Sequence, residues 1–138
     1  METLLAHHAV SQTLYRYASA VDMKDWSTLR ALFTDDAEGI YGDREPLIGG
    51  DNIVEWIQDA TKDCVWQHHL LSVYHVDLVE VDHAQALTYH TSHQISTGEP
   101  DSVRLLVGRY RDRLVRVDGR WLISNKHFEI GWRETRTR

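Results

Sequence analysis

The sequence predicts an α+β fold in which helices come first and a strongly curved, mostly antiparallel sheet follows. Apolar residues recur at three- and four-residue steps as far as Ala60, which is typical of amphipathic helices. After Lys62 they alternate with polar residues, which is typical of strands. Long strands joined by short turns must curl, so we expect the helices on the concave side of the sheet.

Three helices are predicted in the first part of the chain. The first covers residues 2–21, and its apolar face contains Leu5, Ala9, Val10, Leu14, Tyr17, Ala18 and Val21. The polar segment DMKDW ends it. A second, short helix is expected from Ser27, a favourable N-cap, through Phe33, and a third from a cap at Asp51 or Asn52 to Ala60. One short strand lies between the last two helices.

Four strand-like runs predict a meander of long antiparallel strands. They cover residues 64–79, 84–97, 102–117 and 120–131, and the segments VDH, TGEPD and DG separate them. Turns of this length join neighbouring antiparallel strands. Because the chain length is that of one ordinary domain, we expect a single domain over residues 1–138.

Charge and composition argue against several classes of protein. The formal charge is −6 and the basic residues form no continuous stripe, so nucleic-acid binding is not expected. No apolar run approaches the roughly 18 residues of a membrane span, and the first residues lack the pattern of a signal peptide. Cys64 is the only cysteine, so no internal disulfide can form. We expect a cytoplasmic protein that does not bind membranes.

The end of the first predicted helix carries Tyr15, Tyr17 and Asp22. Tyr17 and Val21 share the apolar face, so Tyr17 should point inward, where its hydroxyl needs a partner. Asp22 has two interpretations. It is either a carboxylate directed into a cavity or a solvated turn residue beside Lys24, and composition alone favours the turn.

The segment WQHHLLS places two histidines on the first long strand. Alternation puts Trp66, His68 and Ser72 on the more apolar face and His69 on the other. His68 is therefore expected inside the fold. There it is either a core residue or, because the pKa of histidine lies near neutrality, a proton carrier.

The next strand carries His90 and His93, of which only one can face the interior because they are three positions apart. The small residues Ala84 and Ala86 share the parity of His90, which favours His90. No HExxH or CxxC metal motif is present, so no metal is expected. The GxGxxG, P-loop and GxSxG patterns are also absent, and we expect no cofactor.

The order of five segments resembles the SnoaL-like family of the NTF2-like superfamily. They are RYASAVDMKDW, LRALFTDDAE, a glycine-rich turn leading to IVEWI, QHHLLS and GRYRDRLVRVDGRWLIS. Together they cover nearly the whole chain. The resemblance implies a cone-shaped fold built around one ligand pocket.

Within the superfamily, the resemblance extends to scytalone dehydratase, bile-acid dehydratases and the lindane dehydrochlorinase. These share a tyrosine, an aspartate and a strand histidine, which correspond to Tyr17, Asp22 and His68. Relatives commonly carry an asparagine four residues after the histidine, whereas this chain has Ser72. Relatives also often place a late-strand arginine in the pocket. The sequence leaves Arg109 and Arg116 open for that position.

The resemblance implies a cofactor-free lyase, most simply a dehydratase, acting on a small hydrophobic cyclic or polyketide-like molecule. His68 would be the base, Asp22 would orient it, and Tyr17 would donate a hydrogen bond to the substrate. The expected substrate contacts are Tyr15, Trp66, Ser72, His90 and Arg109. An isomerase or cyclase would use the same residues, and a non-catalytic binding protein or assembly subunit is the alternative of another class.

The outer face of the sheet is expected to carry apolar residues, among them Leu71, Val73 and Val79. Such a surface would be left in contact with water in a monomer. We therefore expect a homodimer or small homo-oligomer.

Overall fold

The computed structural model describes all 138 residues and places three helices against one six-stranded sheet. The helices are α1 (Glu2–Asp22), α2 (Trp26–Ala31) and α3 (Gly50–Ala60). The strands are β1 (Phe33–Tyr41), β2 (Leu47–Ile48), β3 (Cys64–Glu80), β4 (His83–Ser96), β5 (Ser102–Val117) and β6 (Arg120–Thr137). Their order is β2-β1-β6-β5-β4-β3, and all neighbours are antiparallel except β1 and β6. The predicted α+β class is confirmed.

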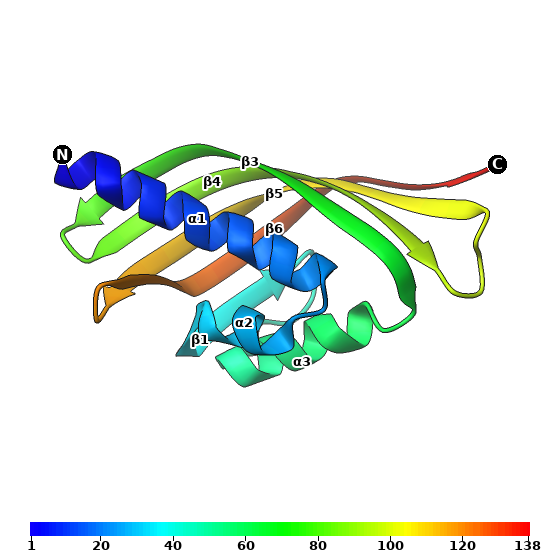
Figure 1. The fold of residues 1–138 in the computed structure, drawn as a ribbon, viewed down its shortest axis with the longest axis horizontal. Helices are drawn as coiled ribbons and strands as arrows, with labels where there is room; N and C mark the ends of the chain where they lie inside the picture. Colours follow the sequence, from blue (N-terminus) through cyan, green and yellow to red (C-terminus); the bar gives the residue numbers. More distant parts are fainter.

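The long strands β3 to β6 curve around the helices, which lie on their concave side (Figure 1). α1 packs against β3 and β6, and α2 and α3 pack against β1. The predicted inner face of α1 is buried at Val10, Leu14, Tyr17 and Val21. Leu5, which was predicted on the same face, is 59% exposed because the first turns of the helix extend beyond the core. At the right of Figure 1 the sheet extends beyond the end of α3. None of the helices has both the length and the apolar character needed to cross a membrane.

The second helix differs from its prediction at both ends. α2 is capped by Asp25 and not by Ser27, because the Asp25 carboxylate accepts a hydrogen bond from the backbone N–H of Thr28 at 3.3 Å. A carboxylate at this position satisfies a free N–H group of the first turn. Phe33, which was expected in the helix, is the first residue of β1 and is buried.

The predicted caps of the third helix are also wrong, because α3 has no side-chain cap. Asp51 instead accepts a hydrogen bond from Nε of Arg30 at 2.6 Å, and Nδ2 of Asn52 donates to the carbonyl of Ile48 at 2.8 Å. Gly49 precedes the helix with φ of 99°, a conformation that glycine adopts without steric cost.

The pairing of β3 with β4 has three register shifts, the last between Leu78 and Glu80, and the first two are bulges that change which residues of β3 face the helices. One lies between Cys64 and Trp66 and the other between Val73 and His75. Each inserts one residue and so exchanges the faces of the residues that follow. Between the bulges, the inward-facing residues are Gln67, His69, Leu71 and Val73. The predicted even-numbered inner face is therefore wrong in this segment, although it holds for the buried Cys64 and Val76 outside it.

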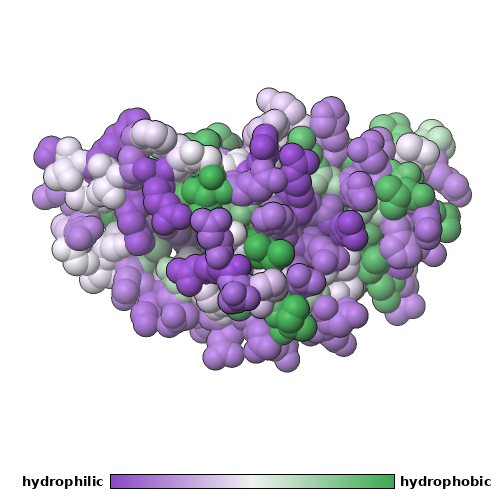
Figure 2. Space-filling model, turned by 180° about the vertical axis from the view of Figure 1, so that it is seen from behind, coloured by the Kyte–Doolittle hydropathy of each residue, from purple (hydrophilic) through white to green (hydrophobic).

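The outer face of the sheet carries different apolar residues from those predicted. The exposed large hydrophobic residues on this face of β3 include Trp66, Leu70 and Tyr74. Leu71 and Val73 pack against the core, and of the predicted residues only Val79 is exposed. On the side turned away from α1, hydrophobic residues form separate spots among hydrophilic ones (Figure 2). Self-association through this face stays a prediction.

A buried ion pair lies beneath the C-terminal half of α1. Nζ of Lys126 on β6 is 2.9 Å from Oδ2 of Asp112 on β5, and their side chains are 1% and 0% exposed. The same nitrogen lies 3.9 Å from the ring centroid of Tyr110 and 4.3 Å from that of Tyr17. Burial lowers the pKa of Lys126 and raises the pKa of Asp112, and each partner opposes the shift of the other. The charges are stable inside the fold only as a pair.

Removal of one charge from this pair should destabilise the protein strongly. Lys126→Met leaves the Asp112 carboxylate buried without its counter-ion, and we expect it to lower the free energy of unfolding by about 3–5 kcal/mol. Lys126→Met combined with Asp112→Leu should cost much less than the sum of the single changes. Urea unfolding measures all three. Arg116→Gln, at the exposed ion pair with Asp82, is the control and should cost less than about 1 kcal/mol. Additive losses would contradict this account.

Candidate functional site

A pocket of about 520 Å³ lies between the C-terminal end of α1, α3 and the concave face of the sheet. Its polar inner residues are Tyr17, Tyr41, His69, His90 and Tyr110. Apolar walls come from α3 through Trp56 and Ile57 and from β6 through Phe128 and Ile130. An apolar cavity with a few converging polar groups is the usual form of a small-molecule site.

A second hollow, of about 580 Å³, is slightly larger but has a different character. Most of its lining residues are polar or charged, among them Asp77, Arg111, Arg113 and His127. It contains little apolar surface that a ligand could bury, so the pocket beside α1 is the better candidate site.

Asp22, the last residue of α1, holds His69 of β3 through both carboxylate oxygens. Oδ2 accepts the backbone N–H of His69 at 2.9 Å, and Oδ1 is 2.6 Å from Nδ1 of its ring. Their side chains are only 18% and 11% exposed, so Asp22 is not a solvated turn residue. Because a carboxylate only accepts hydrogen bonds, Nδ1 carries the proton and Nε2 of the neutral ring keeps its lone pair. The arrangement leaves a basic nitrogen on a histidine that lines the pocket.

Two further contacts fasten the end of α1 to β3. Nε2 of Gln67 donates to the carbonyl of Val21 at 3.0 Å, and Nζ of Lys24 donates to the carbonyl of Cys64 at 2.8 Å. Gln67 is buried. These bonds tie the end of α1 to the first residues of β3, and the Val21 carbonyl accepts the backbone N–H of Lys24 as well.

His68, predicted to be the interior histidine, lies on the opposite face of β3. Its Nε2 is 3.3 Å from Nδ1 of His93 on β4, and its ring packs edge-on against Trp66 with the centroids 5.1 Å apart. The first bulge is the reason, because it moves His69 to the inner face in place of His68. Alternation gave no signal for this exchange, because Leu70 shares the parity of His68 just as Leu71 shares that of His69.

The preference for His90 over His93 is confirmed. His90 is 2% exposed and lines the pocket, with its ring centroid 5.2 Å from that of His69 and 4.7 Å from that of Phe128. Its Nδ1 has no hydrogen-bond partner. Burial, and after it repulsion from Lys126 and from His69 when that ring is protonated, lowers the pKa of His90 to about 3. The ring is therefore uncharged near neutral pH.

Three buried tyrosines form one side of the pocket. The hydroxyls of Tyr17 and Tyr41 are 2.8 Å apart, and the ring of Tyr110 packs edge-on against Tyr17 with centroids 5.8 Å apart. The inward position predicted for Tyr17 is confirmed. Tyr41 and Tyr110 were not predicted. Tyr110 lies on the same face of β5 as the buried Asp112. Burial raises the pKa of all three phenols, so they remain protonated and able to donate hydrogen bonds.

Four of the predicted substrate contacts lie outside the pocket. They are Tyr15, Trp66, Ser72 and Arg109. Tyr15 is 41% exposed because a step of two residues carries it about 200° around the helix from Tyr17. The bulge turns Trp66 and Ser72 outward together with His68.

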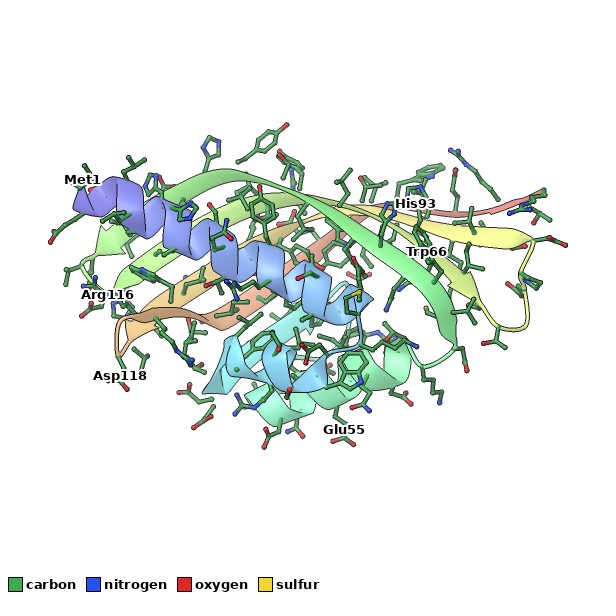
Figure 3. The ribbon with its side chains drawn as sticks, in the orientation of Figure 1. Met1, Glu55, Trp66, His93, Arg116 and Asp118 are labelled. Carbon is green, nitrogen blue, oxygen red and sulfur yellow. The ribbon has the colours of Figure 1, made fainter.

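The arginines of the pocket also differ from the prediction. Arg109 lies on the outer face, where its Nε donates to Glu129 at 2.6 Å, because its parity on β5 is opposite to that of Tyr110. Arg116 lies near Asp118 at the end of the sheet opposite Trp66 (Figure 3). The arginines that line the pocket are Arg44, Arg104 and Arg133. No three or more His, Cys, Asp or Glu side chains are grouped so that they could hold a metal ion.

The fold and the pocket define a protein with a curved sheet around one ligand site. Residues 2–127 match the model of the SnoaL-like domain, and the chain belongs to this family of the NTF2-like superfamily. No curated protein sequence matches this chain.

Solved structures with the same fold differ in their named activities. A protein from Novosphingobium aromaticivorans, provisionally named a scytalone dehydratase, aligns over 99% of this chain and 90% of its own, with 22% identity and a TM-score of 0.88. Hexachlorocyclohexane dehydrochlorinase LinA-type3 from Novosphingobium barchaimii covers 98% and 92%, with 15% identity and a TM-score of 0.87. A protein from Novosphingobium aromaticivorans, provisionally named an aromatic ring hydroxylase, covers 94% and 91%, with 21% identity and a TM-score of 0.79. At these identities the likeness shows the fold alone.

The buried His90 should make stability depend on pH in a defined direction. Its folded-state pKa of about 3 lies below the ordinary 6.5, so the unfolded chain binds the proton first as pH falls. Above pH 6.5 the ionisation of His90 has no effect on the free energy of unfolding, and below pH 6.5 stability is lost progressively. Denaturant unfolding from pH 7.5 to 4 should show that His90→Leu removes about one proton from the pH dependence. His8→Gln, at an exposed histidine of α1, is the control. An unchanged slope in His90→Leu would contradict the lowered pKa.

Proposed function

We propose that the protein is a cofactor-free lyase, most simply a dehydratase, that removes a proton next to a carbonyl group. The observation that carries the proposal is the contact of both Asp22 oxygens with His69, which leaves Nε2 as a base in a largely apolar pocket. A positioned histidine with an orienting carboxylate is a common arrangement for general base catalysis. His69, on the inner face, therefore takes the role of base that the family resemblance implies for His68.

Nε2 of His69 takes a proton from the carbon beside the substrate carbonyl, and Asp22 stabilises the imidazolium that forms. The phenol of Tyr17 donates a hydrogen bond to the enolate oxygen, and Tyr41 donates its proton to the oxygen of Tyr17. A hydroxyl at the neighbouring carbon then leaves with the proton from His69 as water, and a carbon–carbon double bond forms. His90 contacts the substrate as a neutral ring.

The pocket supports a small hydrophobic cyclic substrate. Its volume of about 520 Å³ suits a molecule of two or three rings, and Trp56, Phe128 and Ile130 supply apolar walls. Isomerisation or cyclisation needs the same first step, because an enolate can also be reprotonated elsewhere or close a ring. We also propose that the protein forms a homodimer or small homo-oligomer, through the exposed Trp66, Leu70 and Tyr74.

A non-catalytic binding protein is the second candidate function. The unpaired Nδ1 of His90 favours it, because a bound molecule that accepts or donates one hydrogen bond would satisfy this atom. Deuterium exchange distinguishes the two functions, since only a base in the pocket accelerates exchange at carbon.

The protein should speed the exchange of the protons beside the carbonyl of 2-tetralone, a hydrophobic bicyclic ketone, in D₂O. NMR follows the exchange without depending on which reaction the natural enolate undergoes. His69→Asn and Asp22→Asn should each lower the rate by about a hundredfold or more, and the double variant should be little slower than the slower single variant. His68→Asn is the matched control and should keep the rate. No acceleration by the wild type, or equal effects at His68 and His69, would overturn the proposal.

The hydroxyl of Tyr17 should matter more to the rate than to stability. Its ring is buried against Tyr110, and Tyr17→Phe keeps that packing. We expect the 2-tetralone exchange rate to fall by about ten- to a thousandfold, as for a lost oxyanion donor. The lost bond to Tyr41 should cost only about 0.5–1.5 kcal/mol of stability. Tyr74→Phe, on the exposed outer face, is the control. A loss of activity that merely follows a large fall in melting temperature would place Tyr17 in the core alone.

A further inference from the structure

Three exposed arginines line the pocket, and the part that they line is called its mouth. Arg44 lies between β1 and β2, Arg104 is on β5 and Arg133 is on β6. Arg104 pairs with Thr135 and Arg133 pairs with Leu106, so the two arginines are diagonal neighbours on the concave face. The guanidinium carbon of Arg44 is 5.4 Å from the ring centroid of Trp56 on the opposite wall.

None of these three guanidinium groups forms an ion pair with a carboxylate of the chain. The one carboxylate that lines the mouth, Glu134, already binds Arg136 and accepts the indole N–H of Trp132. The arginines of the outer face are different, since Arg109 and Arg111 share Glu129 at 2.6 Å each. The mouth therefore has positive charge that the protein itself does not neutralise.

This local positive charge is opposite in sign to the net charge of the whole chain, which is −6. Guanidinium groups bind carboxylates and phosphates through paired hydrogen bonds, and they do so more strongly beside apolar walls than in open water. Nη2 of Arg104 donates to Sγ of Cys64 at 3.6 Å, but a thiol does not neutralise its charge. A wholly hydrophobic ligand would gain nothing from three arginines without a carboxylate partner. A ligand with an acidic group would form charge-assisted hydrogen bonds to them.

Strand spacing gives the length that such a ligand needs. His69 pairs with Ser92 and Ser92 pairs with Leu106, so Arg104 lies two strands across and two residues along from His69. Two strand spacings and two residues along a strand together separate the two backbones by roughly 12 Å. Since arginine side chains reach several ångströms back into the pocket, the acidic group should lie roughly two fused rings away from the reacting carbon.

We propose that the mouth is an anion subsite and that the substrate is a hydrophobic ring compound with a carboxylate or phosphate at the end distant from His69. This inference rests on the proposed function for its reacting end, and the anion subsite itself needs only binding. Arg104 and Arg133 hold the acidic group. Arg44 closes over it from the side of Trp56.

The test compares three ligands of one shape by isothermal titration calorimetry at pH 7.5: naphthalene-2-carboxylate, 2-naphthyl phosphate and the uncharged naphthalene-2-carboxamide. At least one acid should bind about tenfold or more tightly than the amide, because its hydrogen bonds to the guanidinium groups are charge-assisted. The acid that binds more tightly shows whether the subsite prefers a carboxylate or a phosphate. Raising the salt concentration should weaken the binding of the acid and leave the binding of the amide unchanged.

Paired variants locate the effect. Arg104→Gln with Arg133→Gln should remove most of the preference for the acid, whereas Arg109→Gln with Arg111→Gln, on the outer face, should keep it. His69→Asn should also keep it, so a protein that prefers acids but does not accelerate 2-tetralone exchange would refute only the catalytic proposal. Equal affinity for acid and amide, no binding of either acid at millimolar concentration, or a preference that survives the loss of Arg104 and Arg133 would overturn the anion subsite.

Discussion

The attachment of the C-terminal turn of α1 to β3 is the interaction on which the pocket depends. Asp22 uses both oxygens on His69, and Gln67 and Lys24 bind carbonyls across the same junction. These bonds hold the end of the helix over the concave face. They also orient the imidazole, so one set of contacts serves both folding and the proposed chemistry. The apolar face of α1 also packs on the sheet, but this junction is what fixes the direction of Nε2 of His69.

Polar groups beneath α1 show a second constraint on the fold. Lys126 and Asp112 are buried as a pair under the rings of Tyr17 and Tyr110, in a position that apolar side chains could fill. Buried charges cost solvation energy, and a pair of this kind is seldom the most stable solution. The pair keeps a positive charge close to the faces of phenols that line the pocket. The polar character of this layer is thus consistent with a site for a ligand that carries oxygen at its reacting end.

Some of the candidate site followed from local patterns and some did not. Tyr17 lies inside because the helical period places it there, and His90 lies inside because its parity matches Ala84 and Ala86. Asp22 could not be decided from composition, since its role depends on a strand far along the chain. The assignment to His68 failed because a bulge is a feature of strand pairing, which period-two alternation does not reveal.

The sequence by itself determined the α+β class, the order of the three helices and the four long strands, most of the apolar face of α1 and the family resemblance, but it predicted one short strand where β1 and β2 lie. These follow from periodicity, turn residues and ordered motifs, all of which are local properties of the chain. Tertiary structure decided which histidine meets Asp22, that Tyr41 and Tyr110 join Tyr17, and that the pocket arginines are not those on the outer face. Each of these depends on register and curvature, which arise only when strands distant in sequence pair and bend around the helices.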